Sequence, residues 1–171
     1  MYNNFLPNEY VKDVYQLSAN DFLNRGIKGI ITDLDNTLVA WDRPDATPEI
    51  ATWIKEMQDA GLKVTILSNN NELRVKSFCE PIDTPFIFSA RKPLSKSFKK
   101  ALHEMQLKKE EVVMIGDQLM TDILGGNRFG LYTILVVPVA SSDGVMTKFN
   151  RQLERRVMKT LKRKGMISWE E

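Results

Sequence analysis

The sequence predicts an α/β fold built around one parallel sheet of about five strands. Two observations carry this prediction. Short runs rich in β-branched residues alternate along the chain with segments of helical periodicity, which is typical of parallel strands joined by helices. The 171 residues also contain no repeat, low-complexity stretch or convincing linker. A chain of this length is therefore expected to form a single domain over residues 1–171.

The strand candidates are short apolar runs of the kind that parallel sheets bury on both faces. The first helix between them has clear end signals, because Thr47 can cap it, Pro48 suits its first position and Gly61 can stop it. Another helix is expected to begin at Ser95. The expected strands are 27–34, 62–68, 85–90, 111–117 and 131–137, the third being the weakest, and shorter helices are expected over 70–79 and 118–129.

This core, approximately residues 27–140, follows an N-terminal arm over 1–26 and precedes a basic tail. The composition, with 43% hydrophobic and 27% charged residues, is that of a soluble globular protein. The single cysteine, Cys79, cannot form an internal disulfide and is expected to pack in the core. The chain shows no secretory signal and no apolar run near the ~20 residues that span a bilayer. We therefore expect a cytoplasmic protein, with peripheral contact to the inner face of the membrane left open.

Polar residues stand where the strand candidates end. In parallel α/β folds, ligands bind at the carboxyl ends of the strands, near a switch in strand order. If the strands are parallel, these side chains converge on one crevice. The group consists of Asp33, Asp35, Ser68, Lys92, Asp117 and Asp122.

The charge of this group points to a metal ion. Four aspartates and one lysine leave three negative charges in a small space, and carboxylates at a partly buried site repel one another strongly. Either some of them are protonated or a divalent cation is bound. Oxygen ligands without histidine or cysteine suit Mg²⁺ better than Ca²⁺ or Zn²⁺. The only histidine, His103, falls on the helix expected over 95–106 and is interpreted as a surface residue.

The motifs DLDNTL, LSN, RKP and GDQLMTD occur in this order between residues 27 and 137. Together they resemble the four motifs of the haloacid dehalogenase-like (HAD) phosphatases. The resemblance implies a three-layer, Rossmann-like HAD fold and hydrolysis of phosphomonoesters through an aspartyl-phosphate intermediate. It implies Asp33 as the nucleophile and Asp35 as the general acid that later acts as the base.

The resemblance also implies ligands for metal and phosphate. Ser68 and Asn69 would hold phosphate oxygens, and Lys92 would offset negative charge on the nucleophile and the transferred group. The implied Mg²⁺ ligands are the side chains of Asp33 and Asp117, the main-chain carbonyl of Asp35, and Asp122 as a ligand or as a neighbour of one.

Each of these residues also has a purely structural interpretation. Asp33 alone could cap a strand end, Ser68 could be a turn hydroxyl, and Asp122 could be a charge on a helix. Thr37 is interpreted as ordering the loop after Asp35. The presence of both early acids favours hydrolysis over a domain that only binds.

The intervals 35–68 and 68–92 are too short to hold the cap domain that many HAD relatives carry. An uncapped site suits a large or surface-bound substrate, whereas a small substrate would need a second subunit to cover it. An oligomer is therefore possible. The loop 39–48 is expected to overhang the site, where Trp41 and Arg43 could contact substrate, although Trp41 could equally pack under the loop.

The tail carries the basic character of the chain, with eight Lys/Arg and three Glu from Met146 onward, a net of +5. An amphipathic helix is expected over approximately 146–165, with an apolar stripe and many cations. Such a helix can contact anionic lipid, contact nucleic acid, or dock on its own domain with its charged face in solvent. The stripe consists of Phe149, Leu153, Val157 and Leu161.

The short DNTL form, the absence of a cap and the FNRQLERRVMK tail resemble the YqeG-type HAD phosphatases, whose relatives include mitochondrial phosphatidylglycerophosphate phosphatase. The resemblance implies a lipid phosphomonoester as substrate. Two alternatives stay open: a phosphatase of a small soluble metabolite, and a nucleic-acid or ribosome-associated protein that uses the basic tail. The second is disfavoured because the tail lacks interleaved aromatics and the chain has no recognisable nucleic-acid module.

Overall fold

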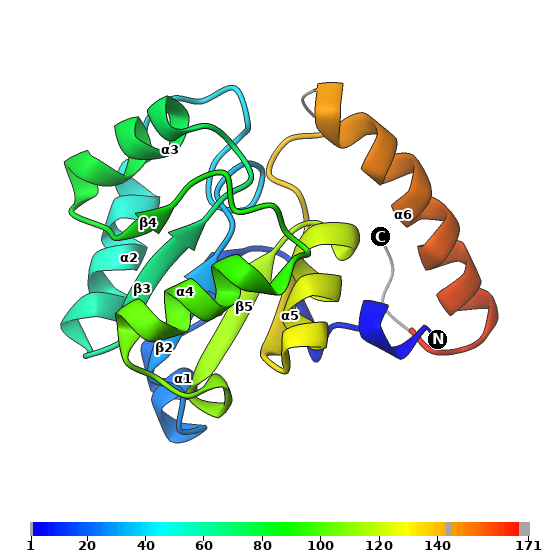
Figure 1. The fold of residues 1–171 in the computed structure, drawn as a ribbon, viewed down its shortest axis with the longest axis horizontal. Helices are drawn as coiled ribbons and strands as arrows, with labels where there is room; N and C mark the ends of the chain where they lie inside the picture. The colour runs from blue at the N-terminus through cyan, green and yellow to red at the C-terminus, as the bar shows by residue number, and fades with distance from the viewer. Residues whose placement is uncertain (1, 143–144, 168–171) are drawn as a thin grey trace.

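The computed structural model describes residues 2–142 and 145–167, and of residues 145–150 the backbone alone. The fold is α/β, with helices packed on a single parallel sheet (Figure 1). The sheet has six strands in the order β1-β6-β5-β2-β3-β4. They are β1 (Glu9–Val11), β2 (Gly29–Thr32), β3 (Lys63–Leu67), β4 (Phe86–Ile87), β5 (Val112–Gly116) and β6 (Tyr132–Val136).

The sixth strand, β1, was not predicted, because only about five strands were expected and none in the N-terminal arm. It pairs in parallel with β6, where Tyr10 stands opposite Leu135. This strand has only three residues, all half-buried, so it lacks the apolar run that identifies the other strands. Its position is decided by pairing with a strand far away in the sequence.

The helices begin where the end signals indicate. The Thr47 hydroxyl accepts a hydrogen bond from the Ile50 backbone N–H at 3.2 Å, and Pro48 is the first residue of the helix it caps. Ser95 is the first residue of the next long helix, as expected. The helices are α1 (Ala19–Asn24), α2 (Pro48–Asp59), α3 (Glu72–Cys79), α4 (Ser95–Met105), α5 (Leu124–Phe129) and α6 (Val145–Arg163).

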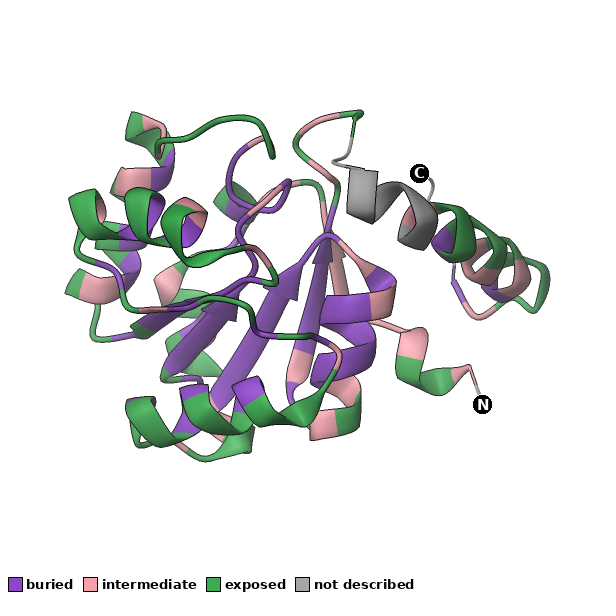
Figure 2. Ribbon diagram, turned by 45° about the horizontal axis from the view of Figure 1, so that its top comes forward, coloured by how far each residue is buried: buried purple, intermediate pink, exposed green. Residues whose placement is uncertain are grey.

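The sheet forms the middle of three layers, with most of its strand residues buried (Figure 2). Helices α1, α2 and α3 pack on one face, where Phe22, Ile54 and Phe78 share a core with Ile30. Helix α4 packs on the other face against Ile31, the next residue of β2. Among the described residues no inserted cap domain is present, since each interval between the strands holds at most one α-helix, short 3-10 or π-helical turns, and loops.

The order in which the chain adds strands reverses at the middle of the sheet. From β2 the chain continues to β3 and β4 on one side, while β5 and β6 lie on the other side. The carboxyl ends of the neighbouring strands β2 and β5 therefore form the switch point at which parallel sheets bind ligands.

Helix α6 lies at one edge of the domain, beyond α5 (Figure 1). The predicted apolar stripe does not face the domain as a unit: Leu161 is buried, but Leu153 is 37% exposed. The reason is geometric, because residues spaced by four drift about 40° around a helix at each step. The side chain of Phe149 lies outside the described residues. The face turned toward the domain carries Arg151, Glu154, Met158 and Leu161.

Apart from Arg151, which faces the domain, the described cations of α6 are exposed. They are Arg155, Arg156, Lys159, Lys162 and Arg163, followed by the exposed Lys164 just beyond the helix, whereas the side chain of Lys148 lies outside the described residues. In this structure α6 therefore docks on its own domain with its charged face in solvent. No helix in the described part of the chain combines the length and the apolarity needed to cross a membrane.

Candidate active site

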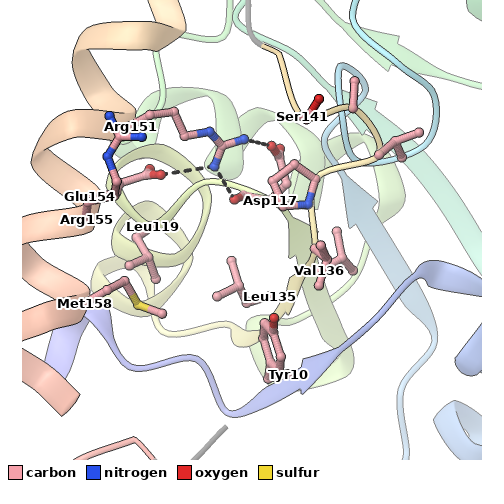
Figure 3. Close-up of a pocket in the computed structure, with 14 residues that line it drawn as sticks. Tyr10, Asp117, Leu119, Leu135, Val136, Ser141, Arg151, Glu154, Arg155 and Met158 are labelled. Atoms are coloured by element: carbon pink, nitrogen blue, oxygen red, sulfur yellow. Dashed lines mark hydrogen bonds and ion pairs between the residues drawn. The ribbon is translucent and has the colours of Figure 1, made fainter. Parts of the chain in front are cut away.

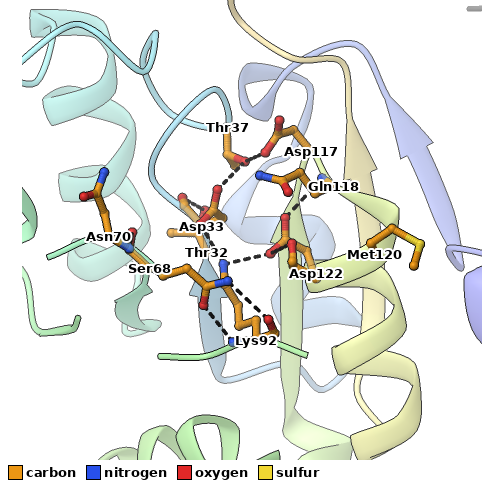
Figure 4. Close-up of polar contacts among 12 residues, drawn as sticks. Thr32, Asp33, Thr37, Ser68, Asn70, Lys92, Asp117, Gln118, Met120 and Asp122 are labelled. Carbon is orange, nitrogen blue, oxygen red and sulfur yellow. Dashed lines mark hydrogen bonds and ion pairs between the residues drawn. The ribbon is translucent and has the colours of Figure 1, made fainter. Parts of the chain in front are cut away.

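Side chains from four strand ends meet at the switch point of the sheet (Figure 4). Asp33 follows β2, Ser68 follows β3 and Asp117 follows β5. Lys92 comes from the loop after β4 and reaches into the same crevice. Asp122 enters from a π-helical turn, Leu119–Ile123, that precedes α5.

Three buried carboxylates form the centre of the site. Asp33, Asp117 and Asp122 each offer an oxygen that lies within 4.8 Å of the oxygens of the other two. Hard divalent cations prefer this kind of ligand set, which contains only oxygen. These three residues therefore could hold a divalent cation. A bound cation would neutralise the mutual repulsion of their buried carboxylates.

Lys92 is the internal counter-ion of this cluster. Its ammonium Nζ lies 2.6 Å from Asp33 Oδ1 and 2.7 Å from Asp122 Oδ1. Burial opposes the charge of Lys92 and would lower its pKa, but the carboxylates of Asp122 and Asp33 outweigh this effect and raise the pKa above its ordinary value. Lys92 is therefore charged at any physiological pH.

Asp122 can approach the cluster because residue 116 is glycine. A Cβ atom at Gly116 would lie 2.3 Å from Asp122 Cγ, a distance that no side chain could tolerate. The π-helical turn aims Asp122 inward, and the Gln118 backbone N–H donates to its Oδ2 at 3.1 Å. Burial raises the pKa of Asp122 to about 6, although the charge of Lys92 acts in the opposite direction.

Asp117 has two partners that the motifs did not predict. The Thr37 hydroxyl donates to Asp117 Oδ1 at 2.9 Å and lies 3.4 Å from Asp33 Oδ2, so Thr37 links two members of the cluster. The guanidinium of Arg151, from α6, forms an ion pair with Asp117 Oδ2 and donates to its main-chain oxygen at 2.7 Å. Burial raises the pKa of Asp117 well above its ordinary value, with the charge of Arg151 lowering it in part.

Asp35 lies beside the cluster but turns its carboxylate to other partners. Arg74 donates from Nε and Nη2 to Asp35 Oδ1 at 3.1 and 2.9 Å, and the Asn70 amide donates to Oδ2 at 2.9 Å. Burial raises the pKa of Asp35, while the Asn70 hydrogen bond and the Arg74 charge lower it in part. Neither Arg74 nor Asn70 belongs to a motif that could have identified it from the sequence.

Ser68 and Asn69 order the loops around the site. The Ser68 hydroxyl is buried and accepts a hydrogen bond from the Asn70 backbone N–H at 3.1 Å. The Asn69 side chain bonds the backbone of Lys92 on both sides, accepting from its N–H at 2.7 Å and donating to its carbonyl at 3.2 Å. Asn69 thus positions Lys92, and the phosphate-binding roles of Ser68 and Asn69 stay predictions.

The loop after Asp35 is held in place by Asn36. This residue adopts a left-handed backbone conformation with φ 64°, which asparagine tolerates. Its side-chain amide N–H donates to the Ser142 carbonyl, and its Oδ1 accepts from the Trp41 backbone N–H. The Trp41 indole N–H donates to Ser142 Oγ at 3.2 Å, and its side chain is 39% exposed. Arg43 is exposed on the same loop. Substrate contact by Trp41 and Arg43 stays a prediction.

Two predictions about residues outside the site are confirmed. His103 lies exposed on α4, away from the strand ends, and Cys79 is buried in the core. Burial raises the pKa of the Cys79 thiol to about 12, so this thiol is not nucleophilic at neutral pH.

The affinity for a divalent cation is expected to depend on pH. Because burial raises the pKa of Asp122 from 3.8 to about 6, protonation of this group stabilises the metal-free fold fully below pH 3.8, and this contribution is lost as pH rises through 6. Protons and the cation compete for the same oxygens. Excess Mg²⁺ should therefore raise the thermal midpoint more at pH 8 than at pH 5. An equal Mg²⁺-induced shift of the thermal midpoint at pH 8 and pH 5 would contradict the assignment of Asp122 to the metal site. Asp122→Asn should make this shift depend less on pH.

The fold and the acidic cluster at its switch point define a HAD-like hydrolase, and the family model described as HAD-hydrolase-like matches residues 89–161. The chain is 62% identical over 167 residues to "Probable phosphatase YqeG" of Bacillus subtilis (strain 168), covering 98% of this chain and 97% of that protein. It therefore belongs to the YqeG-type phosphatases of the HAD-like superfamily, which are phosphoric monoester hydrolases.

Two more distant proteins are also similar. The chloroplastic/mitochondrial phosphatidylglycerophosphate phosphatase 1 of Arabidopsis thaliana is 25% identical over 171 residues, covering 94% of this chain and 49% of that protein. A solved structure described as a HAD superfamily subfamily III A hydrolase from Legionella pneumophila superposes with a TM-score of 0.56 at 21% identity, covering 70% of this chain and 72% of that one. The second likeness concerns the fold alone.

Proposed function

We propose that this phosphatase is Mg²⁺-dependent and hydrolyses a phosphomonoester on a phospholipid head group, such as phosphatidylglycerophosphate. The observation that carries the phosphoryl-transfer chemistry is the buried centre in which Lys92 joins Asp33 to Asp122 beside Asp117. The lipid substrate has weaker support: an uncapped site, a helix with exposed cations, and similarity to a plant protein named for phosphatidylglycerophosphate.

In the first step, a carboxylate oxygen of Asp33 attacks phosphorus. The bond from phosphorus to the alcohol oxygen breaks, and Asp35 gives its proton to the departing oxygen. Burial raises the pKa of Asp35, which favours the protonated form that an acid needs. Lys92, 2.6 Å from Asp33 Oδ1, fixes the nucleophile and offsets negative charge on the transferred group.

In the second step, Asp35 accepts a proton from a water molecule that attacks phosphorus. The bond between phosphorus and the Asp33 oxygen breaks, inorganic phosphate leaves, and both acids return to their starting forms. Asp33, Asp117 and Asp122 would hold Mg²⁺, which when bound offsets the charge of the phosphate oxygens. Mg²⁺ is favoured because the ligands are oxygens without histidine or cysteine.

The lipid assignment is tested with the full-length protein and Mg²⁺. Turnover of phosphatidylglycerophosphate in anionic vesicles is compared with turnover of a panel of soluble phosphomonoesters. We expect the lipid to have the highest kcat/KM. Rapid turnover of one sugar phosphate and none of the lipid would overturn the lipid substrate and leave the phosphatase chemistry standing.

Peripheral membrane contact through α6 is a separate prediction. Each Lys or Arg near an anionic surface contributes about 1 kcal/mol of binding free energy, so replacing four with Glu should weaken vesicle binding at least about 100-fold. Co-sedimentation with anionic vesicles measures this change. The four substitutions are Arg155→Glu, Arg156→Glu, Lys159→Glu and Lys162→Glu, all at exposed positions of α6.

A matched control separates a local effect from total charge. Reversing the exposed Lys96, Lys99, Lys100 and Lys108, on α4 and just beyond it, changes the net charge by the same amount on another face. Vesicle binding should survive in the control. If both variants keep wild-type binding, α6 is not the membrane contact.

A further inference from the structure

A groove of about 570 Å³ lies between the end of β6 and helix α6 (Figure 3). Its floor is apolar and is formed by Tyr10, Leu119, Leu135 and Met158, which come from β1, the π-helical turn, β6 and α6. Val139, on its lip, is 54% exposed. Pockets of about 300–1,000 Å³ with such linings bind drug-sized ligands.

The groove adjoins the acidic centre at Asp117. Asp117 belongs to the carboxylate cluster and also lines the groove, where Arg151 pairs with it. A molecule with its phosphate at Asp33 would enter the groove beside Asp117 and Arg151. The part of a phosphomonoester that extends in this way is its alcohol.

The side chains of the groove indicate the chemistry of that alcohol. Leu119 and Leu135 have no polar atoms, so they favour hydrocarbon over the hydroxyl groups of a sugar. Arg155 lines the groove from α6 and is exposed, which suits a second anionic group such as a phosphodiester.

We propose that this groove binds the alcohol portion of the substrate and selects phosphomonoesters of apolar alcohols. The proposal rests on the proposed phosphatase function, but it does not require one particular lipid. The occupant is the hydrocarbon part of this alcohol, which Leu119, Leu135 and Met158 contact while the phosphate lies at the carboxylate cluster.

Two non-hydrolysable ligands test the groove directly. The dissociation constants of methylphosphonate and hexylphosphonate are measured by calorimetry with Mg²⁺. Each fully buried methylene adds about fourfold in affinity, so hexylphosphonate should bind at least about tenfold more tightly than methylphosphonate, even in a half-open groove. Met158→Glu, which places a charge on the floor, should bring this ratio close to one.

A control variant lies on the same helix. Leu153 is exposed and does not line the groove, so Leu153→Glu should keep the wild-type ratio. Val139→Glu, on the lip and outside α6, should lower the ratio even if Met158→Glu loosens the helix. The ratio of kcat/KM for hexyl and methyl phosphate should follow the same pattern.

Equal binding of the two phosphonates by the wild-type protein would overturn the groove assignment, and so would an unchanged ratio in both groove variants. Absence of binding by either phosphonate, together with equal kcat/KM for the two esters, would also overturn it. A clear preference for hexyl ligands without turnover of phosphatidylglycerophosphate would support the groove and reject only that lipid.

Discussion

Asp33→Asn is expected to abolish phosphatase activity, with kcat/KM lowered by more than about 10⁴-fold, while the protein stays folded. The amide has the shape of the carboxylate but is not a nucleophile, so the first step cannot start. Lys92 keeps Asp122 as a partner at 2.7 Å, and the loss of one of three clustered carboxylates relieves repulsion. The thermal midpoint should therefore stay close to that of the wild type.

The measurement has two parts. Turnover is followed with a soluble phosphomonoester, and acid-quenched protein is checked for covalently bound radiolabelled phosphate. The wild type should carry label during turnover and the variant none. Asp59→Asn is the matched control, because Asp59 is exposed and makes only a surface ion pair with Lys55. Full turnover by Asp33→Asn would reject Asp33 as the nucleophile.

Lys92→Met is expected to lower both activity and stability. The substitution leaves the buried carboxylates of Asp33 and Asp122 without their counter-ion, and breaking a buried pair in this way typically costs about 3–5 kcal/mol. For a chain of this size, that corresponds to a fall of roughly 6–20 °C in the thermal midpoint. Activity should fall at least about 100-fold, because a fixed positive charge beside the reacting group is lost.

Mg²⁺ distinguishes an electrostatic role of Lys92 from mere packing. A divalent cation also neutralises the cluster, so excess Mg²⁺ should restore more of the thermal midpoint in Lys92→Met than it adds to the wild type. Lys96→Met is the control, because Lys96 is exposed at the start of α4. If the variant unfolds at the same temperature as the wild type in chelator, the cluster does not depend on Lys92 for its charge balance.

The local sequence was sufficient for most of the framework. The buried strands β2, β3, β5 and β6 are continuous apolar runs, and burial on both faces is the property that makes such runs recognisable. The capped start of α2 is equally local, because Thr47 bonds a backbone group three residues away. Features that depend on residues close together in the sequence can be predicted from the sequence.

The partners of the site residues were not predictable in the same way. Arg151 reaches Asp117 across 34 positions and Arg74 reaches Asp35 across 39, and no periodicity links either pair. In the sequence Arg151 is one cation among eight in a basic tail. Only the docking of α6 on the domain selects it, and that same docking forms one wall of the apolar groove.

Residue type and order alone predicted which acids follow which strands, the lysine and the hydroxyl beside them, and intervals too short for a cap. These follow from residue type and order, because a parallel sheet places its strand ends at one edge whatever the details of packing. Only the tertiary structure shows that β1 completes the sheet and which face of α6 turns inward. It also shows that Arg151 pairs with Asp117 and Arg74 with Asp35. Those features depend on contacts between distant segments, for which local pattern carries no signal.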